Sequence, residues 1–300
     1  MLSVVFRTNM TIFVAVTVGL FVATAARVTN AQHETAQTEN YLNAKRAASC
    51  FADENVAALA VAAARGDLQR IDYLVAQGVN PNAQANNSMT PLMWAIQAKN
   101  KAGFRRLLQR GGCPDYVVKG DVFDRFLGPA SRSLIGLASK DENDSEWLEI
   151  LLNHGANPNL VHPKIGGDDT VDYSAGTTPI FNAIDSRRMR NVDLLVRSGA
   201  DINHQDNRGN TPMVYAASFG GFNIVLRLLE AGADYRIRNN DGDSLAYVTA
   251  RFERRIDDVS NSGRDCKRVI VFLGSKGVDM DLARSKVAEE RRRSEPKYKH

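Results

Sequence analysis

The sequence has few of the residues on which a disulfide framework or a membrane domain depends. Three cysteines occur in 300 residues. They are too few for a disulfide scaffold, and an odd number cannot pair completely within one chain. The apolar run over residues 12–23 is shorter than the roughly 20 residues that a membrane-spanning helix needs. A disulfide-rich domain and a multi-span membrane protein are therefore excluded.

The sequence also lacks the patterns that mark common catalytic and metal sites. It contains no Gly-x-Ser-x-Gly elbow and no glycine-rich phosphate loop. No two of its five histidines have the i, i+4 spacing of a helical metal site, so we interpret them as polar loop or cap residues. The acidic loop 168–172 lacks the alternating ligand spacing of a calcium loop. We expect no catalytic residues, no metal and no cofactor.

Positive and negative charges balance outside the C-terminus, and an excess of one sign occurs only there. The net charge is +4, and residues 284–300, with seven Lys/Arg and three Asp/Glu, account for all of it. A basic tail on a neutral body is a weaker indication of nucleic-acid binding than a basic domain. We therefore expect no nucleic-acid partner. The tail is interpreted as disordered and solubilising, with weak membrane contact as the alternative.

The N-terminus has the order of a secretory signal peptide. Arg7 precedes the apolar run 12–23, small residues follow at 24–26, and a polar stretch begins at Asn30. Cleavage after Ala26 or Ala31 would export the body of the protein. The alternative is an uncleaved membrane anchor, and in both cases the body lies outside the cytoplasm.

The body of the chain is periodic. Leucine-rich pairs are each followed by a closing glycine, at positions 78, 111, 155, 199, 232 and 277, with spacings of 33, 44, 44, 33 and 45 residues. Thr-Pro steps at Thr90, Thr178 and Thr211 mark the starts of three units, and alanines follow them. Thr caps a helix and Pro suits its first position, while glycine suits the left-handed end. Each unit thus predicts two helices that bury their apolar faces only by stacking.

These units resemble the ankyrin repeat. The clearest copy is residues 209–234, and the resemblance covers roughly residues 55–279. The histidine that usually follows Thr-Pro-Leu is absent throughout, and the third unit lacks Thr-Pro. The resemblance implies an all-α ankyrin-repeat solenoid of about six helix-turn-helix units with short β-hairpin fingers. We expect the sixth unit to be the C-terminal cap, with a polar outer face.

The expected organisation is a signal peptide (1–31), a polar leader (32–54), an ankyrin repeat domain (55–280) and a basic disordered tail (281–300). We expect a monomer that meets a membrane only through the signal peptide or weakly through this tail. Trp94 is interpreted as a core residue. The cysteines are either free or loosely paired.

The resemblance implies that a partner protein meets the finger tips and the exposed surface of the first helices. Phe219 is the most informative residue there, because an aromatic side chain that faces water in a groove is typical of an interface anchor. Packing against Tyr215 is the alternative. The insertions 117–129 and 161–173 either bind a partner or brace the third unit. The predicted partner-binding residues are Asn86, Asn87, Met89, Gln97, Phe123, Arg125, Phe126, Asp185, Asn207, Arg208, Asn210, Phe219, Asn240 and Asp241.

The chain further resembles a group of exported bacterial ankyrin-repeat proteins, in residues 50–59, 90–95 and 146–152. Members of that group resemble immunity proteins of type VI secretion effectors, often lipases. The resemblance implies a non-catalytic periplasmic protein that binds and neutralises a toxin. The alternatives are a general periplasmic scaffold that binds client proteins, a secreted protein that binds host proteins and, from another class, an enzyme built on the irregular loops.

Overall fold

The computed structural model describes residues 43–85, 88–117, 133–141, 144–163, 175–253, 255 and 260–294. The chain divides into two compact units, residues 1–112 and 113–300. The expected signal peptide and most of both insertions lie outside the described residues.

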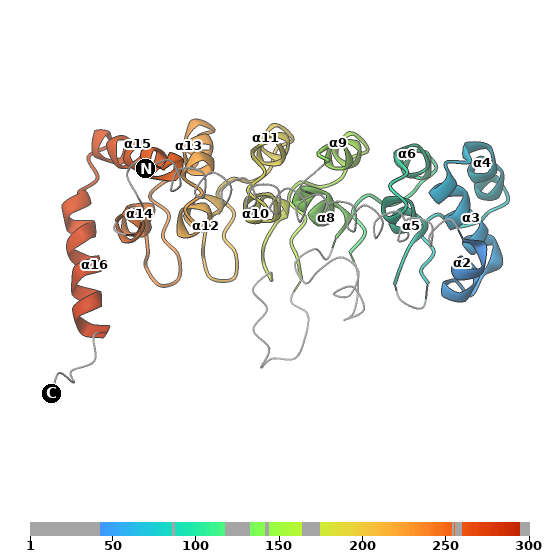
Figure 1. The fold of residues 1–300 in the computed structure, drawn as a ribbon, viewed down its shortest axis with the longest axis horizontal. Coiled ribbons are helices and arrows are strands. Elements are labelled where there is room, and N and C mark those ends of the chain that lie inside the picture. Colours follow the sequence, from blue (N-terminus) through green and yellow to red (C-terminus); the bar gives the residue numbers. More distant parts are fainter. Residues whose placement is uncertain are drawn as a thin grey trace, which may run out of the picture. The chain divides into compact units, whose positions relative to one another are not determined.

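The first unit is built from helix pairs. α3 and α4 form one pair, α5 and α6 form the next, and α2 packs on α3 (Figure 1). α3 also packs directly on α5, so the first helices of the two pairs are neighbours. The bounds are α2 Ala44–Cys50, α3 Glu54–Arg65, α4 Leu68–Ala76, α5 Pro91–Gln97 and α6 Lys101–Gln109.

The second unit repeats this arrangement. Its first helices α8, α10, α12 and α14 pack in a row, and each has a second helix from the series α9, α11, α13 and α15. α16 packs on α14 and lies across the end of the row (Figure 1). The bounds are α8 Leu134–Lys140, α9 Glu146–Asn153, α10 Pro179–Asp185, α11 Met189–Arg197, α12 Pro212–Ser218, α13 Phe222–Glu230, α14 Leu245–Glu253, α15 Asn261–Ser275 and α16 Met280–Ser294.

The expected all-α ankyrin-type fold is confirmed, and the described residues contain six helix pairs. The fingers are simpler than the predicted β-hairpins. Within the described ranges the only strand-like pairing is an isolated antiparallel bridge between Val117 and Ser133. The fingers are instead closed by tight turns, as where the Asp206 amide donates to the Asn210 carbonyl at 3.1 Å.

The Thr-Pro steps begin helices as predicted. Thr90 Oγ1 accepts the Met93 amide and Thr211 Oγ1 accepts the Val214 amide, each at 3.3 Å, and proline occupies the first turn of each helix. α10 also begins with proline, but its capping residue Thr178 makes no such bond. A side-chain cap satisfies one of the free amides at a helix start, so two of the three steps are capped in this way.

Small residues let neighbouring helices approach closely in the first unit. Ala60 and Ala63 of α3 are fully buried, and a Cβ at Gly103 of α6 would collide with the Ala63 carbonyl. Trp94 is 1% exposed and packs edge-on against Phe51, with ring centroids 5.6 Å apart. The prediction that Trp94 is a core residue is confirmed.

The polar leader predicted over residues 32–54 is wrong in its last part, where α2 forms. The Asn43 side chain accepts the Lys45 amide at 2.9 Å and caps this helix. Ala47 is fully buried and Phe51 is 2% exposed. These two apolar side chains anchor the segment to the first unit, because their burial removes apolar surface from water.

The disordered tail predicted over residues 281–300 is wrong for residues 281–294, which belong to α16. Met280, Ala283 and Val287 recur at i, i+3 and i+7, and each is 7% exposed. This spacing forms one apolar helix face, and it packs on α14. The sixth helix pair is therefore not the outermost element, because α16 covers it.

Two further observations concern membranes and disulfides. Across the described ranges, no helix is long and apolar enough to cross a membrane. Cys50 lies in α2, Cys266 is buried in α15, and Cys113 is exposed. No disulfide joins these three residues.

Candidate functional site

The finger tips of the second unit are shaped by side chains that bond to their own backbone. Asp206 Oδ1 accepts the amides of Arg208 and Asn210 at 2.9 and 2.8 Å. Asn239 Oδ1 does the same for Asp241 and Asp243, at 3.1 and 2.8 Å. Asx side chains that bond to nearby amides stabilise tight turns, so both tips are held in defined conformations.

Successive fingers are also bonded to each other. The Asn240 amide donates to the Arg208 carbonyl at 2.9 Å, and Asn240 Nδ2 donates to the Asn207 carbonyl at 3.1 Å. Asn239 Nδ2 donates to Asn210 Oδ1 at 3.0 Å. We number each finger by the repeat that it precedes, so the fifth finger is residues 201–211, before α12, and the sixth is residues 234–244, before α14. Asn210 and Asn240, which were predicted to bind a partner, therefore already join the fifth finger to the sixth.

An aromatic stack lies beside these tips, on the first helices α10 and α12. Phe181 and Tyr215 pack edge-on with ring centroids 5.3 Å apart, and Phe219 lies 5.1 Å from Tyr215. Phe219 is nevertheless 56% exposed. Both expectations for this residue are thus met in part, because it packs on Tyr215 and still presents most of its ring to water.

Polar groups hold this stack in place. Tyr215 Oη donates to Asp185 Oδ1 at 2.6 Å, and Arg187 Nη2 donates to the Phe219 carbonyl at 3.1 Å. Burial and the Asp185 carboxylate raise the pKa of Tyr215 well above its usual value, so the hydroxyl remains a donor. We call Asp185, Arg187, Tyr215 and Phe219 the Phe219 surface.

The predicted partner-binding residues differ in how far the structure exposes them. Asp185, Asn207, Arg208, Phe219, Asn240 and Asp241 are exposed in the second unit, and Asn210 is half-buried there. In the first unit Gln97 is half-buried, whereas Met89 is 3% exposed. The assignment of Met89 to a partner surface is wrong, because its side chain belongs to the core. Asn86, Asn87, Phe123, Arg125 and Phe126 lie outside the described residues.

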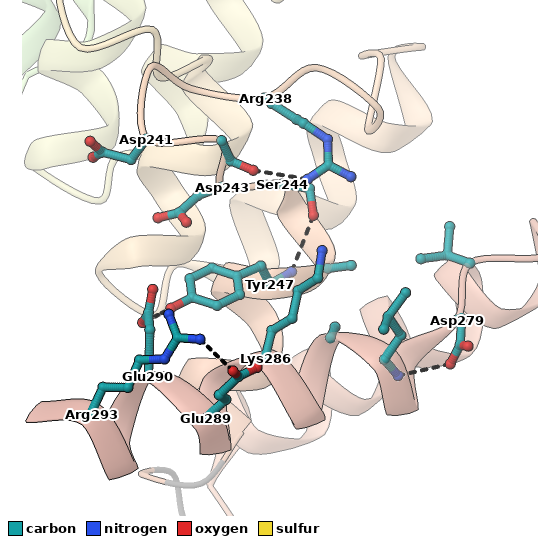
Figure 2. A pocket seen from close by; sticks show the side chains of 15 residues that line it. Arg238, Asp241, Asp243, Ser244, Tyr247, Asp279, Lys286, Glu289, Glu290 and Arg293 are labelled. Carbon is teal, nitrogen blue, oxygen red and sulfur yellow. Dashed lines mark hydrogen bonds and ion pairs between the residues drawn. The ribbon is translucent and has the colours of Figure 1, made fainter.

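A pocket that the sequence analysis missed lies between the sixth finger and α16 (Figure 2). Its volume is about 420 Å³, which is in the range of small-ligand pockets. This pocket was not predicted because residues 281–300 were expected to form a disordered tail. The apolar spacing of Met280, Ala283 and Val287 was the available signal. The lining side chains labelled in Figure 2 are Arg238, Asp241, Asp243, Ser244, Tyr247, Asp279, Lys286, Glu289, Glu290 and Arg293.

Charge in this pocket is mixed and partly paired. Tyr247 Oη donates to Glu290, and Arg293 pairs with Glu289 at 2.6 Å. Burial, followed by the bond to Glu290, raises the pKa of Tyr247 to about 12. Burial also raises the pKa of Asp243. The pocket therefore holds acidic groups close together beside the last finger.

His162 is a buried connector between the first two helix pairs of the second unit, which are the third and fourth repeats of the chain. It is fully buried, with Nε2 3.2 Å from Ser133 Oγ and Nδ1 3.2 Å from Thr177 Oγ1. Ser133 also caps α8 by accepting the Gly136 amide at 3.0 Å. This histidine lies in a loop, in agreement with its interpretation as a polar loop or cap residue, and the structure adds that its side chain is buried against Ser133, the cap of α8. Among the residues that the structure describes, no group of three or more His, Cys, Asp or Glu could hold a metal ion.

Several known proteins are similar to this chain over part of its length. Rabankyrin-5 of Mus musculus is 26% identical over 179 residues, covering 58% of this chain and 15% of that protein. B-cell lymphoma 3 protein homolog of Mus musculus is 27% identical over 199 residues, covering 66% of this chain and 40% of that protein. Protein phosphatase 1 regulatory subunit 27 of Mus musculus is 39% identical over 75 residues, covering 25% of this chain and 48% of that protein. The chain spans less than half the length of each.

One family model matches most of the periodic region of the chain. The model described as ankyrin repeats (3 copies) matches residues 28–118 and 135–239, more than half of the chain. This match agrees with the stacked helix pairs of both units. Ankyrin repeats form protein–protein interaction modules, and the chain belongs to the ankyrin repeat family.

Proposed function

We propose that this chain is an exported, non-catalytic protein that binds a partner protein through the Phe219 surface. The observation that carries the proposal is the exposure of Phe219. A phenyl ring that is 56% exposed gains more from burial in an interface than the polar residues around it. Because Tyr215 and Arg187 already hold it in place, little conformational entropy is lost when a partner covers it.

The charges beside the ring favour a specific partner. The Asp185 carboxylate accepts the hydroxyl of the neighbouring Tyr215, the Arg187 guanidinium donates to the Phe219 carbonyl, and both charged residues are exposed. Opposite charges at the rim of an interface select complementary partners and orient their approach. The Phe219 surface therefore combines an aromatic anchor with a polar rim, the arrangement that binding hot spots use.

The cellular role that we propose is a periplasmic immunity protein that blocks a secreted toxin of the type VI, lipase-like kind. The support is the order of residues 1–31, which is that of an export signal, together with the resemblance of residues 50–59, 90–95 and 146–152 to exported bacterial ankyrin-repeat proteins. A general periplasmic scaffold for client proteins is the second candidate, and a secreted protein that binds host proteins is the third. The similarity to a phosphatase regulatory subunit over 75 residues supports binding, not catalysis, as the class of activity.

The experiment is a co-purification from the native envelope fraction, with the exported part of the chain as bait. The test bait carries Phe219→Ala and Arg208→Ala. The control bait carries Val271→Ala, which removes another exposed apolar side chain of the same unit, 72% exposed on α15. Each captured protein is identified, produced alone in the periplasm of a test strain, and assayed for toxicity with and without this chain.

An immunity role predicts one toxic partner that the native and Val271→Ala chains capture and the double variant loses. Co-expression of the native chain then restores growth. Several housekeeping proteins, retained by the double variant and not toxic, would favour the scaffold and contradict the assignment of the Phe219 surface.

A further inference from the structure

The fingers of the second unit dock on each other by a repeated device. The asparagine of one finger lies over a glycine of the preceding finger, with Asn207 over Gly176 and Asn240 over Gly209. At Gly209 a Cβ would lie 2.5 Å from Asn240 Oδ1 and 2.7 Å from its amide nitrogen. A side chain at these glycines would therefore displace the next finger, and the absence of a Cβ admits the asparagine.

The sixth finger presents the same device, but no asparagine of the described residues lies over its glycine. Gly242 occupies the position that corresponds to Gly209, 33 residues later, and a Cβ there would meet no atom of the described residues within 4 Å. The Arg208 carbonyl of the fifth finger accepts the Asn240 amide, whereas the corresponding Asp241 carbonyl accepts no hydrogen bond from any residue that the structure describes. The next element, α16, packs on the helix α14 and brings no finger of its own.

The open position is also one wall of the pocket of about 420 Å³ shown in Figure 2. Asp241 and Gly242 line it from the finger, and Glu290 lines it from α16. The Asp241 side chain is exposed and forms no ion pair with the other described residues. Arg238 Nη1 donates to the Gly242 carbonyl at 2.8 Å, as Gln205 Nε2 donates to the Gly209 carbonyl at 2.7 Å one finger earlier. The Gly242 carbonyl is therefore occupied, whereas the Asp241 carboxylate, with Asp243 beside it, is left to attract a further cation. The fifth finger already carries such a group, Arg208, directly after its asparagine.

We propose that Asp241, Gly242 and Asp243, which we call the Gly242 notch, bind a turn of a partner protein with the sequence asparagine, basic residue, glycine. The asparagine amide lies over Gly242 and its backbone amide donates to the Asp241 carbonyl, as Asn240 does on the fifth finger. The basic side chain pairs with the Asp241 carboxylate. The notch is separate from the Phe219 surface and gives the chain a second contact, at the end of its row of fingers.

The test uses the fifth finger of this chain as the probe, because it has the proposed sequence. A cyclised peptide of residues 204–211, which contains Asn207, Arg208 and Gly209, is titrated into the ¹⁵N-labelled chain and followed by amide chemical shifts. We expect saturable shifts that centre on Asp241, Gly242 and Asp243. Replacing Asn207 by Ala or Arg208 by Glu in the peptide should weaken binding at least fivefold.

Matched variants of the chain separate binding from folding. Asp241→Lys should weaken the peptide at least fivefold, whereas Glu230→Lys, with the same charge change at the exposed end of α13, should not. Gly242→Ala should also weaken it, relative to Gly232→Ala. Both glycines have positive φ, +80° and +90°, and open space around them, so the backbone strain is matched.

Three results would overturn the proposal. They are no shifts at millimolar peptide, shifts that centre on Phe219 or elsewhere, and equal binding to the Asp241→Lys and Glu230→Lys chains. Concentration-dependent shifts of the same amides without peptide would show that a second copy of this chain occupies the notch, and that result would overturn the assignment to a partner. Loss of partner binding in the Phe219→Ala chain tests the Phe219 surface, and the peptide titration tests the Gly242 notch, so either proposal can fail alone.

Discussion

The Arg284 guanidinium of α16 donates from Nε and Nη2 to the two carboxylate oxygens of Glu253 in α14, each at 2.9 Å. This bidentate ion pair joins α16 to α14, the first helix of the sixth repeat. Both side chains are partly exposed, at 41% and 30%, and exposed ion pairs contribute little to stability. The apolar face of Met280, Ala283 and Val287 must therefore supply most of the attachment, while the ion pair sets its position.

The first prediction tests that attachment. Val287→Asp should lower the free energy of unfolding by about 2–4 kcal/mol, because it removes a buried apolar side chain and buries a charge against α14. Leu282→Asp is the matched control on the same helix, since Leu282 is 54% exposed, and should change stability by less than about 0.5 kcal/mol. Urea unfolding followed by circular dichroism measures both. Equal effects would show that α16 is not anchored by this face.

A second prediction concerns the threonine caps. Thr211→Val should cost about 1 kcal/mol of unfolding free energy, because the hydroxyl that accepts the Val214 amide is lost. Thr178→Val should be neutral or stabilising, since the buried Thr178 hydroxyl has no hydrogen-bond partner within the described part of the chain. Thermal and urea unfolding of the two variants give the comparison. A larger cost at Thr178 would contradict the capping pattern.

The third prediction is a pH dependence at Tyr247. Its pKa in the folded protein is about 12, above the value near 10 of an unfolded chain. Between these values the folded state holds the proton more tightly, so the contribution of Tyr247 is present below about pH 10 and is lost as pH rises toward 12.

Stability measured from pH 8 to pH 12 should therefore fall less steeply in Tyr247→Phe than in the native chain. Tyr73→Phe is the control for general alkaline effects, because Tyr73 is 54% exposed and lies in α4 of the first unit. Identical slopes for the native chain and Tyr247→Phe would contradict the bond between Tyr247 and Glu290.

The fourth prediction separates binding from stability at the Phe219 surface. Phe219→Ala should change the free energy of unfolding by no more than about 0.5–1 kcal/mol, because the ring is mostly exposed. Once a partner has been identified, the same change should weaken its binding by at least about 2 kcal/mol, roughly 30-fold. Isothermal titration calorimetry and urea unfolding measure the two quantities. A partner that binds Phe219→Ala and Val271→Ala equally would exclude this residue as the anchor.

The periodic markers were sufficient to predict the stacked helix pairs, although not α2, α16 or the form of the fingers. The Thr-Pro starts, the buried alanines and the closing glycines predicted six helix pairs, and the described residues contain them. These signals are local, because capping, close helix approach and left-handed backbone each depend on one or two residues. Phe219 and its contact with Tyr215 were predictable for the same reason, since they lie four positions apart on one helical turn.

The pocket beside α16 could not be predicted in this way. Residues 284–293 are strongly charged, and charge runs of this kind usually belong to solvated segments. Only the packing of α14 supplies the surface on which Met280, Ala283 and Val287 are buried. The burial of Met89 could not be predicted either. Its position in a finger suggests exposure, but its side chain is only 3% exposed in the structure.

The sequence by itself determined the repeat, its helix starts and ends, and the place of Phe219 as an exposed aromatic residue of the predicted binding face. The tertiary structure decided which polar residues bond to each other and which remain open to a partner. Asn240 and Asp241 are adjacent in the chain, yet Asn240 is bonded to the fifth finger, whereas the Asp241 carbonyl accepts no hydrogen bond from the described residues. The difference arises because finger-to-finger contacts join residues about 33 positions apart, so a finger is covered only where a further repeat follows it.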